Sequence, residues 1–255
     1  MEQATRQIEQ IPVGGTDPDL ALLRAFEPIV RYTRGELFRP MAVEAYVASC
    51  SLWRSERRGD TTCIVPAGQL SIDRLTQESL AHQDAPLSLR YVKEPLGRAE
   101  YRRWRRAPRE RLQATGRFTT TGLFGRLVEA GFRASLLLRG KVSAGLAAAA
   151  EISYSQHGEP DRAVYYGHVV RDGGYACLQY WFFYAMNDWR STFSGVNDHE
   201  ADWELITVYL AEQDDGSWRP AWVAFSSHDE AGDDLRRRWD DPDLQHEGNH
   251  PVVYA

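Results

Sequence analysis

The residues from Asn197 to Glu204, Asn-Asp-His-Glu-Ala-Asp-Trp-Glu, place four carboxylates and one imidazole within a single short stretch. Carboxylate oxygens are hard ligands that suit calcium, magnesium or manganese, whereas an imidazole also suits zinc or iron. The spacing His-x-x-Asp-x-Glu, from His199 to Glu204, is not one of the standard zinc patterns. This stretch therefore predicts a divalent-cation site that favours Ca²⁺ or Mg²⁺ over Zn²⁺.

Asp202 and Glu204 are two positions apart, so on a strand both side chains point to one face. The apolar residues that continue this face are Ile206, Val208 and Leu210. The two carboxylates would then lie at the edge of an apolar core. Such a position costs free energy unless a cation or several hydrogen-bond donors compensate the charge.

A structural interpretation of the same acids stays open. Asp198 and Glu200 would then be solvated turn residues, and Asp202 would accept hydrogen bonds from backbone amides. Elsewhere, His228 follows Ser226-Ser227 at the end of a neighbouring predicted strand, where it could bind the ion or hydrogen-bond a ligand. Asp198 and His228 are therefore candidates for contacts around the ligands, and no residue is predicted to be catalytic.

Composition predicts a globular protein, because 43% of the 255 residues are hydrophobic and 11% are aromatic. Residues 1–150 hold 23 Lys and Arg against 16 Asp and Glu, while residues 151–255 hold 7 against 20. The acidic half suits cation binding and argues against nucleic acid as its partner, since phosphate contacts need clustered basic residues. The three cysteines are too few and too widely spaced for a disulfide framework. Without an apparent signal peptide or membrane span, a cytoplasmic location is expected.

The elements that must position the motif are β-strands in the C-terminal part of the chain. Residues 163–170 and 175–184 flank the turn signal Asp172-Gly173-Gly174 and predict a hairpin. Further strands are expected over 205–211, 221–227 and 251–255. Helical spacing follows the N-cap signal Asp17-Pro18 and recurs over 41–51 and 119–156. The predicted fold is α+β, a β-sandwich mostly from residues 163–255 with N-terminal helices packed around it.

The predicted organisation is a flexible leader, residues 1–16, followed by one α+β domain over residues 17–255. Residues 52–162 are expected to form a helical or irregular insertion in that domain. Within it, residues 98–111 contain seven arginines around Tyr101 and Trp104. This segment is interpreted as a solvated helix face, with a surface for a protein partner, nucleic acid or anionic lipid as the alternative.

Several motifs together carry a resemblance to a known family. In chain order they are 26–30, 36–40, 43–44, 178–184, 198–204, 226–228 and 249–255. These motifs resemble the vacuolar protein sorting-associated protein sixty-two family in content and order, over residues 24–47 and 163–255. The resemblance implies a link to trafficking, without a defined biochemical activity.

A more remote similarity is to the necrosis-inducing, cytolysin-like proteins of plant pathogens, whose signature also ends in Asp-Trp-Glu. In that family the signature surrounds a divalent cation in a β-sandwich that contacts membrane glycolipid. The similarity implies His199, Asp202 and Glu204 as metal ligands, whereas Ala201 stands where the signature has a second histidine. Both families extend beyond the Val-Val-Tyr-Ala strand, which implies that the natural chain continues past Ala255.

Three functional hypotheses follow. The first is a divalent-cation-dependent recognition domain for a membrane lipid or a glycan, with no enzymatic activity. The second is a metal-dependent hydrolase in which the same ion activates water and His228 or Glu200 moves the proton. The third is a cytoplasmic scaffold or trafficking module with no functional metal, which contacts its partner through Arg98–Arg111.

Overall fold

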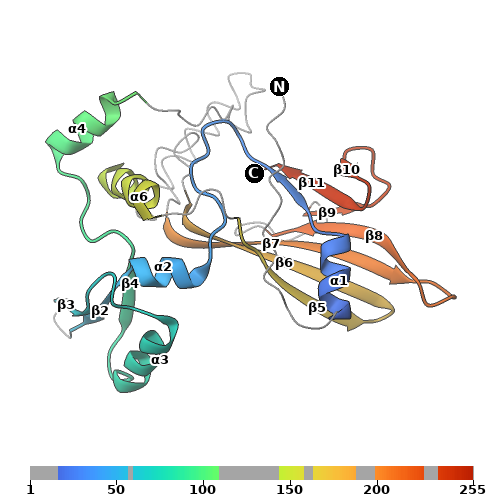
Figure 1. Ribbon diagram of the computed structural model, residues 1–255, viewed down its shortest axis with the longest axis horizontal. Helices are drawn as coiled ribbons and strands as arrows, with labels where there is room; N and C mark the ends of the chain where they lie inside the picture. Colours follow the sequence, from blue (N-terminus) through green and yellow to red (C-terminus); the bar gives the residue numbers. More distant parts are fainter. Residues whose placement is uncertain are drawn as a thin grey trace, which may run out of the picture. The chain divides into compact units, whose positions relative to one another are not determined.

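The computed structural model describes residues 17–56, 60–108, 144–157, 163–187, 199–226 and 235–254 (Figure 1). Among these residues, five helices and eleven strands form an α+β structure with three sheets, which confirms the predicted class. The helices are α1 (Pro18–Ala25), α2 (Val43–Ser49), α3 (Ile72–Ala81), α4 (Arg98–Arg106) and α6 (Ala144–His157). The strands are β1 (Ile29–Arg31), β2 (Ser51–Ser55), β3 (Thr61–Val65), β4 (Leu87–Arg90), β5 (Tyr166–Asp172), β6 (Tyr175–Asn187), β7 (His199–Glu212), β8 (Trp218–Phe225), β9 (Arg236–Arg238), β10 (His246–Glu247) and β11 (His250–Tyr254).

The chain divides into two compact units. Unit 1 contains the described parts of residues 1–32, 162–182 and 203–255, and unit 2 contains those of residues 33–161 and 183–202. The division falls inside β6 and inside β7, where it separates Asp202 from Trp203. The single domain over residues 17–255 stays a prediction, and the leader over residues 1–16 lies outside the described residues.

Unit 1 is built on a sheet with the order β5-β6-β7-β8-β9. The predicted hairpin is confirmed, since β5 and β6 pair antiparallel from Tyr166 opposite Trp181 to Asp172 opposite Tyr175. The turn between them needs two residues with positive φ, which Gly173 at 56° and Gly174 at 79° supply. The strands predicted over 205–211 and 221–227 are present as parts of β7 and β8.

Helix α1 covers part of this sheet. It begins as the sequence indicates, because the Asp17 side chain accepts a hydrogen bond from Asp19 N at 2.9 Å and Pro18 occupies the first helical position. Leu23 is buried, and its carbonyl accepts a hydrogen bond of 2.8 Å from the Tyr180 hydroxyl on β6. On β5 beneath it, a Cβ added to Gly167 would lie 2.6 Å from Leu23 Cδ1. Glycine at that position therefore leaves room for α1, because a Cβ there would force the Leu23 side chain to shift.

A second sheet in unit 1 joins the two ends of the described chain. Strand β1 pairs in parallel with β11, and β10 pairs antiparallel with β11. The His250 ring supports this joint, because its Nδ1 lies 2.8 Å from the carbonyl oxygen of Glu27. The strand predicted over residues 251–255 is confirmed for its described part, and β1 supplies its partner from the other end of the sequence.

Unit 2 holds a three-stranded antiparallel sheet with the order β3-β2-β4. Residues 52–162 were expected to be helical or irregular, and these strands are the main departure from that expectation. The alternating run over residues 87–92 indicated a possible strand, which is present as β4, whereas β2 and β3 were missed because they are short and alternate poorly. Leu52 of β2 and Val65 of β3 belong to a hydrophobic core that also holds aromatic rings. In it, Tyr46 of α2 stacks on Tyr91 at 5.2 Å and meets Phe183 edge-on at 4.9 Å.

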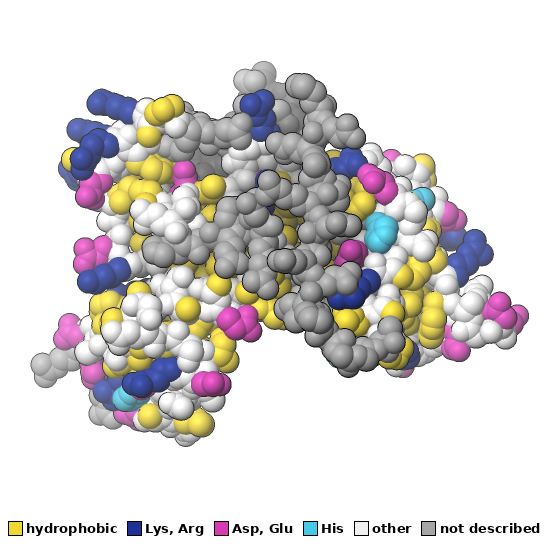
Figure 2. Space-filling model, in the orientation of Figure 1, with side chains coloured by type: hydrophobic (Ala, Val, Ile, Leu, Met, Phe, Trp, Pro, Cys, Tyr) yellow, Lys and Arg dark blue, Asp and Glu magenta, His cyan; other side chains and the backbone are white. Residues whose placement is uncertain are grey.

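The arginine-rich segment forms α4 as far as Arg106, and every arginine of this helix is exposed (Figure 2). Glu100 accepts a hydrogen bond of 3.1 Å from Gly97 N, which fixes the first turn. The helix predicted over residues 119–156 is described only from Ala144 onward, as α6. No helix within the described ranges is long and apolar enough to span a membrane.

Candidate metal centre at the start of β7

The predicted ligands lie on a strand, since β7 already begins at His199 and the motif does not form a loop ahead of it. At the start of β7, Asp202 is buried at 4% exposure and Trp203 is exposed, whereas further along Ile206, Thr207 and Val208 are buried in succession. Ile206, Val208 and Leu210 are buried in the same phase as Asp202. Asp202 is therefore a buried carboxylate, and the expectation that it shares one face with Glu204 and the apolar run stays a prediction.

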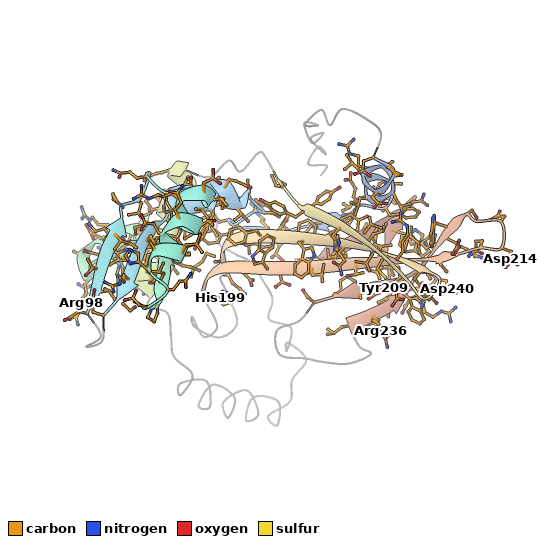
Figure 3. All side chains as sticks on the ribbon, turned by 90° about the horizontal axis from the view of Figure 1, so that it is seen from below. Arg98, His199, Tyr209, Asp214, Arg236 and Asp240 are labelled. Carbon is orange, nitrogen blue, oxygen red and sulfur yellow. The ribbon has the colours of Figure 1, made fainter. Side chains whose placement is uncertain are left out.

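The structure brings two of the three predicted ligands together. His199 Nε2 lies 3.9 Å from Asp202 Oδ1, and the histidine side chain is 43% exposed (Figure 3). This separation is too long for a direct hydrogen bond. The solvent-exposed imidazole of His199 thus lies beside the buried carboxylate of Asp202 at the start of β7.

The third predicted ligand, Glu204, is anchored to the neighbouring strand. Its Oε2 accepts a hydrogen bond of 2.9 Å from the hydroxyl of Ser226, directly after β8. The same Ser226 Oγ accepts a hydrogen bond of 2.9 Å from Leu205 N. Glu204 is half-buried, and these contacts fix its carboxylate at the junction of β7 and β8.

Ala201 gives the motif an unusual backbone. Its φ of 62° makes it the one residue other than glycine with positive φ in the described part of the chain. A left-handed conformation costs an L-residue with a Cβ roughly 1–2 kcal/mol. Strain of this kind is concentrated at functional sites, and here it lies between Glu200 and Asp202.

Glu200 was expected to be a solvated turn residue or, in the hydrolase hypothesis, a proton carrier, yet it makes contacts with residues far away in sequence. Its two carboxylate oxygens accept hydrogen bonds from Tyr91 N at 2.9 Å and Val92 N at 3.1 Å. Burial raises the pKa of the Glu200 carboxyl, and the two N–H donors oppose that shift. No local sequence signal could reveal this contact, because more than 100 residues separate its partners.

The opposite face of β7 carries aromatic rings. Trp203 meets Tyr166 of β5 edge-on at 5.6 Å and Trp181 of β6 edge-on at 6.3 Å. Trp203 remains 39% exposed. Large exposed aromatic groups of this kind are enriched at recognition surfaces.

The expectation that the chain contains no zinc-protease spacing His-Glu-x-x-His was wrong, because residues 246–250 read His-Glu-Gly-Asn-His. That spacing needs a helix to place both histidines on one side, whereas these residues form β10, a turn at Gly248 and β11. His246 stacks on Trp239 with ring centroids 5.3 Å apart, and His250 Nδ1 faces Glu27 O. The pattern is thus part of a hairpin rather than a zinc site.

Asp198 and His228 lie outside the described residues. Within the described ranges, no group of three or more His, Cys, Asp or Glu side chains is arranged to hold a metal ion. The ligand set His199, Asp202 and Glu204 therefore stays a prediction, of which the structure brings the first two residues close together.

Comparisons with known proteins add no further evidence on the family. The resemblance seen in the motifs therefore stays a prediction, and the roles of the residues rest on the geometry given above. No protein-family model, no curated protein and no solved structure matches the chain.

Proposed function

We propose that the chain is a recognition domain without enzymatic activity, which holds a divalent cation with His199, Asp202 and Glu204 and binds a membrane lipid or glycan. The observation that carries the proposal is the distance of 3.9 Å between His199 Nε2 and the buried Asp202 Oδ1. Two atoms that each bind one cation at about 2.0 to 2.6 Å lie about 3 to 4.5 Å apart. One ion could therefore bind both atoms without a rearrangement of the strand.

Charge balance supports the same ligand set. Asp202 and Glu204 together carry two negative charges, which a divalent cation neutralises, and a neutral imidazole adds a third ligand without changing that balance. Such compensation lowers the free-energy cost of a carboxylate as buried as Asp202. A ligand set of two carboxylates and one imidazole is rich in oxygen, which suits Ca²⁺, Mg²⁺ or Mn²⁺. Zinc, by contrast, is favoured by sulfur-rich sites.

The aromatic rings beside the motif support a recognition role. Trp203 lies in sequence between two of the proposed ligands, and its exposed ring packs against the half-buried rings of Trp181 and Tyr166. Aromatic faces stack on the apolar faces of sugar rings and also lie well at the boundary of a membrane. In this proposal the ion fixes the start of β7, and the rings contact the partner.

Calorimetric titration of the protein with Ca²⁺, Mg²⁺ and Mn²⁺ tests the proposal. We expect one site for at least one of these ions, with an affinity that falls about 100-fold or more in Asp202→Asn, which keeps the side-chain shape and removes the charge. Asp214→Ala at the exposed tip of the β7–β8 hairpin is the control and should bind as wild type does (Figure 3). No heat with any of the three ions, or equal affinity in Asp202→Asn, would overturn the proposal.

A second candidate function rests on α4, whose arginines are all exposed. Here the domain is a cytoplasmic scaffold that binds an acidic protein partner or an anionic lipid surface through this helix. We expect binding to anionic liposomes that weakens as salt is added and is lost when Arg102, Arg103 and Arg106 are replaced by Gln. Binding that does not respond to salt would contradict this function.

A further inference from the structure

One face of the five-stranded sheet in unit 1 brings aromatic and polar side chains together. Directly opposed residues of antiparallel strands share a face, so Tyr166 lies beside Trp181 and His168 lies beside Gln179 on one side of β5 and β6. Trp203 of β7 lies on the same side, because its ring contacts the rings of both Tyr166 and Trp181. These five residues define the outer face of the sheet, and all of them belong to unit 1.

Helix α1 lies on the other face of this sheet (Figure 1). On β5 and β6, the positions between those of the outer face include Gly167, which α1 approaches through Leu23, and Tyr180. The Tyr180 hydroxyl donates a hydrogen bond of 2.8 Å to the Leu23 carbonyl. The helix therefore leaves the outer face uncovered.

The outer face also holds much of the exposed apolar surface. Within the described ranges, seven large hydrophobic side chains are exposed, and four of them lie on this face: Val170, Tyr175, Trp203 and Trp222, each 36–39% exposed. Val170 and Tyr175 belong to it by alternation along β5 and β6, and Trp222 of β8 points away from the fully buried pair Val208 and Val223. A gathering of this kind marks a surface that contacts a partner.

Hydrogen-bonding groups lie among the rings. Trp181 Nε1 donates a hydrogen bond of 3.4 Å to Gln179 Oε1, and His168 Nδ1 lies 3.3 Å from the same oxygen. These contacts orient the Gln179 amide. Its NH₂ group makes no hydrogen bond within the part of the chain that the structure describes, so two donors beside the rings remain available to a ligand.

Carboxylates and guanidinium groups lie at the margins of the outer face. Those that the strand register places there are Asp172 at the end of β5, Arg219 near the turn between β7 and β8, and Arg236 and Arg238 of the edge strand β9. Arg238 is itself paired with Asp240 at 2.8 Å. The centre of the face therefore complements an uncharged ligand that has both apolar surfaces and hydrogen-bonding groups.

We infer that the outer face binds a neutral glycan, with Tyr166, Trp181 and Trp203 against the apolar faces of its sugar rings and the Gln179 amide on its hydroxyl groups. A neutral sugar chain combines C–H surfaces with hydroxyl groups and carries no charge, as the centre of this face requires. Nucleic acid does not fit, since phosphate contacts need clustered basic residues. The inference rests on the proposed recognition role, but it makes no use of the cation.

Calorimetric titration of the whole protein with the neutral hexasaccharides cellohexaose, chitohexaose and maltohexaose tests the inference. We expect at least one of them to bind, and we expect Trp203→Ala to lower its affinity about 10-fold or more, because the apolar contact of one ring is lost. The matched control is Tyr254→Ala, which removes a ring that is 59% exposed on β11, outside the five-stranded sheet, and should bind as wild type does. Circular dichroism checks that each variant is folded.

A second variant separates a glycan from an apolar partner. Gln179→Leu removes the amide and keeps a side chain of similar size, so glycan affinity should fall about 3- to 10-fold. The same change makes the outer face more apolar, and it would preserve or strengthen binding to phosphatidylcholine vesicles. This variant also decides the test if Trp203→Ala does not fold.

Each titration is run with Ca²⁺ and again with EDTA, so that the outcomes distinguish this inference from the proposed cation site. Glycan binding that is equal in both would overturn the role of the cation and support the outer face as a glycan site. A protein that binds Ca²⁺ but none of the three hexasaccharides would overturn this inference alone. Wild-type glycan affinity in both Trp203→Ala and Gln179→Leu, or vesicle binding that Gln179→Leu preserves without any glycan binding, would also overturn it.

Discussion

Leu23 of α1 lies so close to Gly167 of β5 that a single added methyl group would reach 2.6 Å from its Cδ1. The atom in the way is the end of the buried Leu23 side chain, so the cost of the added methyl group depends on how far this side chain can shift. Gly167→Ala should therefore lower the free energy of unfolding by about 1–3 kcal/mol, as overpacking does in other cores. Urea denaturation measures the change.

The matching test uses the double variant with Leu23→Ala. If the contact is the cause, Gly167→Ala should be nearly neutral in that background, because the clashing methyl groups are absent. An equal loss of stability in both backgrounds would contradict the packing of α1 on β5.

A second prediction concerns the left-handed backbone at Ala201. Replacing this residue by glycine removes the clash of its Cβ, so Ala201→Gly should raise the free energy of unfolding by about 1 kcal/mol. The control is Ala211→Gly in the extended part of β7, which should lower stability by about 0.5–1 kcal/mol. Thermal denaturation measures whether each substitution raises or lowers the stability of the protein. A loss of similar size in both variants would show that Ala201 is not strained.

The cysteines give a chemical test of unit 2. Cys50 is fully buried, and burial raises the pKa of its thiol to about 12, so at pH 8 only about one molecule in ten thousand carries the reactive thiolate. Cys63 on β3 is exposed. Iodoacetamide at pH 8 should therefore modify Cys63 in the folded protein and reach Cys50 only after unfolding. Peptide mass spectrometry measures both rates, and equal rates in the folded protein would contradict the described core.

Much of unit 1 could be predicted from local signals. The turn between β5 and β6 follows from Gly173 and Gly174, which supply the positive φ values that it requires. The start of α1 follows from Asp17 and Pro18, whose cap and fixed φ act within one turn. These features depend on residues close in sequence, so they can be predicted without knowledge of the fold.

The contacts that organise the candidate site could not be predicted in the same way. His199 and Asp202 are three residues apart, a spacing that on a regular strand would put their side chains on opposite faces, and Glu200 meets Tyr91 and Val92 across more than 100 residues. Strands β2 and β3 also escaped prediction, since they are short and lack a clear period of two, while β4 lies in an alternating run that indicated a possible strand. Long-range pairing of this kind depends on the whole chain rather than on any one segment.

The claim that His199, Asp202 and Glu204 hold one cation is tested most directly by crystals of the protein soaked in Mn²⁺. Data collected at the manganese absorption edge would locate the ion independently of the protein coordinates. The account predicts one anomalous peak about 2.0 to 2.6 Å from His199 Nε2 and from carboxylate oxygens of Asp202 and Glu204. An anomalous peak bound by other residues, or no peak at an ordered motif in saturating Mn²⁺, would contradict it.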